Sequence, residues 1–84
     1  RGAVADLERA LALDPRDAAA LEDRGCARAA LGDPGGALQD YERALALEPG
    51  RASAHYNRGV TRRDLGQNDA ARADFARAVA TGRD

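Results

Sequence analysis

The stretch that decides the fold reads AAALEDRGCARAALGDPGGALQDYERALALEPGR and runs from Ala18 to Arg51. When the chain is compared with itself after a shift of 34 places, 22 of the 50 aligned pairs are identical. The recurring small and apolar residues are Ala3, Ala37 and Ala71; Leu7, Tyr41 and Phe75; Ala10, Ala44 and Ala78; Gly25 and Gly59; Gly32 and Gly66; Pro15 and Pro49. A fixed period of this length is typical of architectures that stack one supersecondary unit on the next.

Apolar residues recur at helical spacing within each unit. In residues 2–14, Val4, Leu7 and Leu11 are separated by charged residues, which predicts an amphipathic helix. The same criterion predicts helices over residues 17–31, 34–48, 51–65 and 69–81. We therefore expect an all-α chain of five helices.

Cap and turn residues mark the helix boundaries. Pro15 cannot continue the first helix, and Asp17 is a natural N-cap for the second. Gly32 closes the second helix, and Asp33 precedes a proline at the start of the third. Asn68 is expected to cap the fifth helix.

Short connections between these helices predict antiparallel pairs, and a pair that recurs along the chain builds a solenoid. Gly25 and Gly59 fall in mid-helix, where glycine costs about 1 kcal/mol relative to alanine. Their recurrence indicates a close approach of two helices. We expect Ala37 and Ala44 to face Gly25, with Tyr41 filling the space between helix pairs.

Two consecutive units resemble the tetratricopeptide repeat. The residues that carry the resemblance are Leu21, Gly25, Leu31, Gly32, Asp33, Ala37, Tyr41, Ala44, Leu47, Glu48 and Pro49 in the first unit, and Tyr56, Asn57, Arg58, Gly59, Leu65, Gly66, Ala71, Phe75 and Ala78 in the second. The sequence departs from the family pattern at Leu21 and His55 for an aromatic residue, at Arg28 and Arg62 for a tyrosine, and at Arg83 for the closing proline.

The resemblance implies a right-handed α-solenoid of antiparallel helix pairs. Residues 1–84 would form a single domain, in which residues 2–14 are the second helix of a truncated repeat, residues 17–48 a full repeat and residues 51–81 a C-terminal full repeat. The resemblance also implies a concave groove that holds an extended peptide or a helix of another protein. We therefore expect a protein-interaction scaffold fragment without enzymatic activity or a cofactor.

The family register also implies which residues line the groove. These residues are Glu22, Asp23, Cys26, Tyr56, Asn57, Val60 and Arg63. Because Glu22 and Asp23 are acidic, we expect a basic protein or peptide as the partner.

One subclass of the family binds a partner's terminal carboxylate with lysines and asparagines. Asn57 stands where one of these asparagines stands, but Glu22 replaces a clamp lysine and Cys26 replaces a second asparagine. The sequence therefore disfavours a carboxylate clamp.

Other polar residues have structural interpretations that outweigh functional ones. His55 occupies a position where the family packs an aromatic ring, so packing is favoured over a role as a metal ligand or base. Cys26 is expected to be unreactive, because nearby carboxylates raise rather than lower the pKa of a thiol. The arginines Arg28, Arg62 and Arg63 are expected to pair with neighbouring carboxylates at the surface rather than to hold phosphate.

Composition excludes several classes of partner. A net charge of −1 gives no basic surface for nucleic acid, which also argues against an RNA-reading helical repeat, and no apolar run predicts a membrane span. The single cysteine cannot form an internal disulfide or a zinc site, which favours the cytoplasm. All 13 basic residues are arginine, which suggests a bacterial source with GC-rich coding.

The two ends of the array differ in polarity. The last helix has Arg72, Thr81 and Arg83 where the middle unit has Leu38, Leu47 and Pro49, as expected of a terminal repeat. The first helix keeps an apolar stripe of Val4, Leu7 and Leu11. We expect this stripe to bind a second copy of itself, giving a homodimer.

Overall fold

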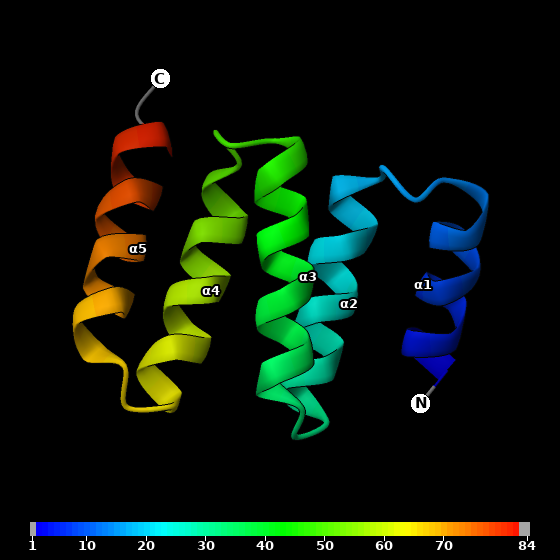
Figure 1. Cartoon of the computed structure of the whole chain (residues 1–84), viewed down its shortest axis with the longest axis horizontal. Coiled ribbons are helices and arrows are strands. Elements are labelled where there is room, and N and C mark those ends of the chain that lie inside the picture. Colours follow the sequence, from blue (N-terminus) through cyan, green and yellow to red (C-terminus); the bar gives the residue numbers. More distant parts are fainter. Residues whose placement is uncertain (1, 83–84) are drawn as a thin grey trace.

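The computed structural model describes residues 2–82, which form five helices and no strand. The helices are α1 (Gly2–Leu13), α2 (Ala18–Ala30), α3 (Pro34–Leu47), α4 (Ala52–Asp64) and α5 (Asn68–Gly82). They stand beside one another in a shallow row, with the two termini at opposite ends (Figure 1). The shape measures 33 × 29 × 15 Å. The predicted all-α arrangement of five helices is confirmed.

The helices begin where side chains or prolines favour a start. The Asp17 carboxylate accepts a hydrogen bond from the Ala20 amide at 3.0 Å, and the Asp33 carboxylate accepts one from the Gly36 amide at 2.9 Å. At α5 the expectation for Asn68 is wrong by one residue. Asn68 is already helical, because the carbonyl of Gln67 accepts the first helical hydrogen bond, from the Ala71 amide.

Two glycines end α2 and α4 in the same way. Gly32 and Gly66 adopt φ angles of 85° and 81°, a left-handed conformation that side-chain-bearing residues rarely adopt. The next residue in each case folds back onto the helix, so that the Asp33 amide donates to the Arg28 carbonyl and the Gln67 amide donates to the Arg62 carbonyl, both at 2.8 Å. These turns direct α3 and α5 back along α2 and α4.

Pairing of the helices follows the repeat. The closest packing joins α2 to α3 and α4 to α5, while α3 meets α4 between the pairs and α1 packs on α2. In addition, α2 touches α4 directly. Because α2 and α4 are the first helices of two successive pairs, their contact brings equivalent faces of the two repeats together.

The mid-helix glycines do mark close approaches, but their partners differ from the expected alanines. A Cβ atom on Gly25 would lie 2.6 Å from Cε1 of Tyr41, and one on Gly59 would lie 2.7 Å from Cε1 of Phe75. The aromatic ring therefore packs against the glycine within a pair, rather than filling the gap between pairs. A ring needs the volume that a missing side chain leaves, which an opposing alanine does not.

The core explains what happens to the apolar stripe of α1. Leu11 is only 8% exposed and belongs to a cluster with Ala18, Ala20, Leu21 and Ala44, against which Leu7, Ala10 and Leu47 pack. Val4 is half-buried. The premise of a homodimer through Val4, Leu7 and Leu11 is therefore wrong, because two of the three leave water by packing on this core.

The last helix shows a mixed outer surface. Arg72 is exposed as expected, but so is Val79, at 59% of its area. The hydroxyl of Thr81 donates to the Arg77 carbonyl at 2.8 Å and so is satisfied within the helix. Arg83 lies outside the described residues. Among residues 2–82, no helix combines the length and the apolar character needed to cross a membrane.

Candidate protein-interaction surface

A hollow lies between the equivalent faces of α2 and α4. Its volume is about 280 Å³, and it is lined by Cys26, Ala29, Ala30, Tyr41, Asn57, Val60, Thr61 and Asp64. Three of the predicted groove residues, Cys26, Asn57 and Val60, lie in this lining. The direct contact of α2 with α4 creates the hollow, because the small residues Ala29 and Ala30 leave space beside Val60.

Tyr41 forms part of this hollow although its side chain comes from α3. It is almost fully buried, and its hydroxyl lies 3.4 Å from the Cys26 sulfur, to which it donates a hydrogen bond. Burial, followed by the contact with Cys26, raises the pKa of Tyr41 above its ordinary value. The phenol therefore stays neutral and remains a hydrogen-bond donor at physiological pH.

Glu22 has a different position from the one expected of a groove residue. It is buried, and its carboxylate accepts hydrogen bonds from Arg51 Nε at 2.5 Å, Ser53 Oγ at 2.9 Å and Asn57 Nδ2 at 2.7 Å. The hydrogen bond to Glu22 raises the pKa of Arg51. Glu22 thus joins α2 to the start of α4, and its charge is compensated internally rather than offered to a ligand.

The same contact changes the interpretation of Asn57. Its amide nitrogen is used by Glu22, so Asn57 cannot use this group to hold a carboxylate without losing a buried hydrogen bond. The remaining predicted residues, Asp23, Tyr56 and Arg63, are exposed and lie outside the lining of the hollow. The Tyr56 ring packs against Phe75 at a centroid distance of 5.5 Å.

Two buried ionic clusters were missed by the sequence analysis. In the first, Arg24 donates to both oxygens of Asp40 at 3.0 and 2.8 Å, and Arg28 adds a third contact at 3.3 Å. The Asp40 residue is only 1% exposed. The hydrogen bond to Asp40 raises the pKa of Arg24. This cluster joins α2 to α3 within one repeat.

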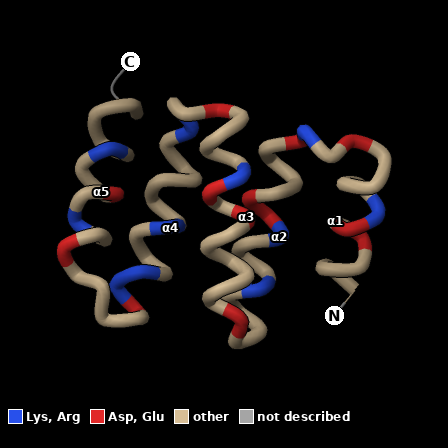
Figure 2. Tube along the Cα trace, in the orientation of Figure 1, with Lys and Arg blue, Asp and Glu red and all other residues tan. Residues whose placement is uncertain are grey.

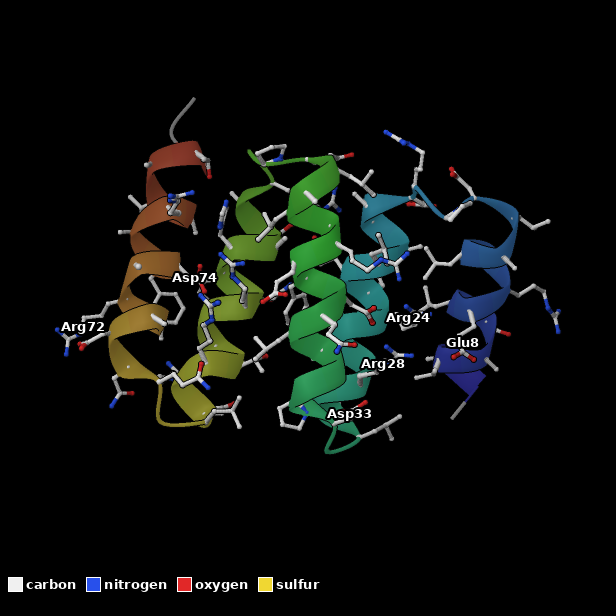
Figure 3. All side chains as sticks on the ribbon, in the orientation of Figure 1. Glu8, Arg24, Arg28, Asp33, Arg72 and Asp74 are labelled. Carbon is white, nitrogen blue, oxygen red and sulfur yellow. The ribbon has the colours of Figure 1, made fainter. Side chains whose placement is uncertain are left out.

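The second cluster repeats the first after 34 residues. Arg58 donates to both oxygens of Asp74, the shortest contact being 2.8 Å, and Arg62 donates at 2.9 Å. Asp74 points into the space between α4 and α5 (Figure 3). Arg28 and Arg62 therefore do pair with carboxylates, as expected, but with buried ones. The signal was present, because these arginines and aspartates recur at the period of the repeat.

His55 has the packing role that its position in the repeat indicates. It is buried, and Nε2 donates to the Pro49 carbonyl at 2.9 Å. The other ring nitrogen, Nδ1, has no hydrogen-bond partner within residues 2–82 and lies 3.9 Å from Asp74. Cys26 is an exposed free thiol. In this part of the chain no three His, Cys, Asp or Glu side chains are grouped so as to hold a metal ion.

The repeat geometry agrees with the comparison of the chain with protein families. A model described as tetratricopeptide repeat matches residues 1–56, and a second with the same description matches residues 40–73. The chain belongs to the tetratricopeptide repeat family. A search of curated protein sequences finds no match to this tetratricopeptide repeat chain.

Solved structures with the same fold include both longer and peptide-bound proteins. The crystal structure of MamA has a TM-score of 0.89 and 26% identity, over 95% of this tetratricopeptide repeat chain and 47% of MamA. The first TPR of Spaghetti (RPAP3), bound to the HSP90 peptide SRMEEVD, has a TM-score of 0.89 and 23% identity, over 93% of this chain and 62% of that one. The second TPR of the same protein, also with that peptide, has a TM-score of 0.87 and 24% identity, over 93% and 72%. The chain thus spans less than half the length of MamA.

Proposed function

We propose that this chain is a protein-interaction scaffold that binds an extended peptide or a helix of another protein across the hollow between α2 and α4. The observation that carries the proposal is the hollow itself, whose lining combines Cys26, Val60 and two alanines with the polar groups of Asn57 and Asp64. A concave, partly apolar surface with a few fixed polar groups is typical of a binding site. The fold shared with peptide-bound tetratricopeptide repeats supports this assignment.

Charge near the hollow favours a ligand with lysine or arginine. Asp64 lies in the lining, and Asp23 lies one turn before Cys26 on α2. Glu22 does not contribute, because Arg51 compensates it. The contact between Arg63 and Asp64 is a surface pair at 3.9 Å that a ligand cation can replace at little cost. Both signs of charge occur on every helix (Figure 2), so the preference arises locally rather than from the whole domain.

The proposed ligand therefore places an apolar side chain in the hollow and a basic side chain beside Asp64. The proposal includes no catalysis and no cofactor. It also does not include self-assembly through α1, because Leu11 belongs to the core.

Fluorescence anisotropy with two labelled peptides tests this proposal. One peptide carries a central valine flanked by lysines, and the other is the acidic sequence SRMEEVD. We expect the basic peptide to bind more tightly at low ionic strength and to weaken as salt is added. Tighter binding of the acidic peptide would contradict the proposed charge preference.

A pair of variants tests the position of the site. Val60→Phe places a ring in the hollow and should weaken the basic peptide by about tenfold or more, equivalent to about 1.4 kcal/mol. The matched control Gln39→Phe changes an exposed residue of α3 outside the hollow and should leave affinity unchanged. Equal affinity of Val60→Phe and the unmodified chain, with both folded, would show that the ligand does not use the hollow.

A further inference from the structure

The first helix carries the residues through which α3 and α5 bind their partner helices, yet part of this face is uncovered. The matching sets are Ala3, Asp6, Leu7 and Ala10 on α1; Ala37, Asp40, Tyr41 and Ala44 on α3; and Ala71, Asp74, Phe75 and Ala78 on α5. On α3 all four residues are buried, and on α5 the first two are. On α1, by contrast, Ala3 and Asp6 are exposed, and Leu7 and Ala10 are half-buried.

The two complete pairs show what covers such a face. In each pair the covering helix supplies two arginines four residues apart, and both donate to the aspartate of the face at distances between 2.8 and 3.3 Å. The glycine that follows the first arginine packs against the large residue of the face, Tyr41 or Phe75. The motif is therefore Arg-Gly-x-x-Arg, and it occurs once in α2 and once in α4.

Asp6 has no such partner among residues 2–82. The one arginine that reaches α1 is Arg28, which lies 3.7 Å from Glu8 (Figure 3) and already donates to the buried Asp40. Asp6 thus has the charge that its counterparts use for recognition while its own carboxylate remains open to solvent.

We propose that the uncovered face of α1 is a docking surface for an α-helix that carries Arg-Gly-x-x-Arg or Arg-Ala-x-x-Arg and runs antiparallel to α1. Both arginines pair with Asp6, and the small residue packs against Leu7. Alanine is accepted here because Leu7 reaches less far than the rings of Tyr41 and Phe75. The inference is independent of the hollow between α2 and α4.

Asp6 supplies the selectivity of this surface. A helix that covers α1 without arginines would bury an unpaired carboxylate, which is strongly unfavourable, whereas the arginine pair compensates it. A second copy of this chain is a poor occupant. Its own motifs in α2 and α4 are held by Asp40 and Asp74, and docking would require these buried pairs to break.

The test uses the full chain extended by a copy of its own motif. A copy of residues 17–34 is joined directly in front of Arg1, which reproduces the register of α2 before α3 because residue 35 and residue 1 are equivalent positions. We expect the extended chain to melt at a higher temperature than the unmodified chain. We also expect the amides of the added segment and of α1 to become protected from hydrogen exchange.

The Asp6→Asn substitution separates the proposed pairing from general packing. In the extended chain it should lower the melting temperature by about 4 °C or more, because it leaves two covered guanidinium groups without a counter-charge. In the unmodified chain, where Asp6 is exposed, it should change the melting temperature by about 1 °C or less. Replacing the two arginines of the added segment by alanine should abolish the difference between the two backgrounds.

Two results would overturn the proposal. One is an equal effect of Asp6→Asn in the extended and unmodified chains. The other is an added segment whose amides exchange as fast as those of an unfolded peptide, which shows that the motif does not dock on α1. Hydrogen exchange gives an answer even if the extended Asp6→Asn variant does not fold over the added segment.

Discussion

The amide of Asn57 on α4 donates a hydrogen bond of 2.7 Å to the buried carboxylate of Glu22 on α2, 35 residues earlier in the chain. Arg51 and Ser53 complete the contacts of this carboxylate. Because the three donors come from the beginning and middle of the next repeat, Glu22 fixes how one repeat sits on the other. The hollow between α2 and α4 depends on this arrangement.

Removing the Glu22 charge should destabilise the domain. Glu22→Ala leaves Asn57 and the partly buried Arg51 without their acceptor, so we expect a loss of about 1 to 3 kcal/mol in the free energy of unfolding. Urea denaturation followed by circular dichroism measures it. The matched control is Glu42→Ala, which removes an exposed carboxylate of α3 and should change stability by about 0.5 kcal/mol or less. Equal losses for the two variants would contradict the proposed link.

Glycine and alanine should have opposite effects at two positions. Gly25→Ala brings a Cβ atom to 2.6 Å from the Tyr41 ring, so the overpacking cost of about 1 to 3 kcal/mol should exceed the gain in helix propensity. Gly35 lies in the first turn of α3, where an added Cβ would meet no atom within 4 Å, so Gly35→Ala should be neutral or stabilise by up to about 1 kcal/mol. Thermal melts of both variants check the signs, and a stabilised Gly25→Ala variant would disprove the close approach.

Neighbouring leucines of α1 should respond differently to substitution. Leu11 is 8% exposed whereas Leu13 is 85% exposed. Leu11→Ala should cost about 2 to 3 kcal/mol, because it leaves a cavity beside Leu21, and Leu13→Ala should cost little. Denaturation curves measure the effect, and sedimentation of both variants shows whether any loss reflects dissociation instead. A Leu11→Ala variant of unchanged stability would show that α1 is not part of the core.

Stability should fall in alkaline solution because of Tyr41. The folded state raises the pKa of this phenol, so the folded chain holds its proton where the unfolded chain, with an ordinary pKa of about 10, releases it. The stabilisation is therefore complete below about pH 10 and is lost as pH rises beyond it. Urea denaturation between pH 8 and pH 11 measures this slope.

The Tyr41→Phe variant should lose part of the alkaline decrease, since it has no group to ionise at this position. The control Tyr56→Phe alters a ring that is 55% exposed and should keep the decrease. If Tyr41→Phe and the unmodified chain lose stability in parallel above pH 10, another group is responsible.

The sequence by itself determined the local structure of this protein. Asp17 and Asp33 cap helices through amides three residues away, and Gly32 turns the chain by its own φ angle, so the information is contained in a few consecutive residues. The period of 34 residues then determined that the helices pair and stack. The mistake at Asn68 had the same local origin, since the repeat places the cap at Gln67, the counterpart of Asp33.

The tertiary structure alone decided which polar residues are free to act. Glu22 has the sequence character of a ligand-binding carboxylate, but its partners lie 29 to 35 residues away and become visible only when two repeats are packed together. Asp6 and Asp40 are the same residue at the same place in the repeat, yet one is exposed and the other is buried between two arginines. The difference is whether a helix covers the face that carries them. A carboxylate leaves water only where a neighbouring element supplies the compensating charge, and no single repeat contains that information.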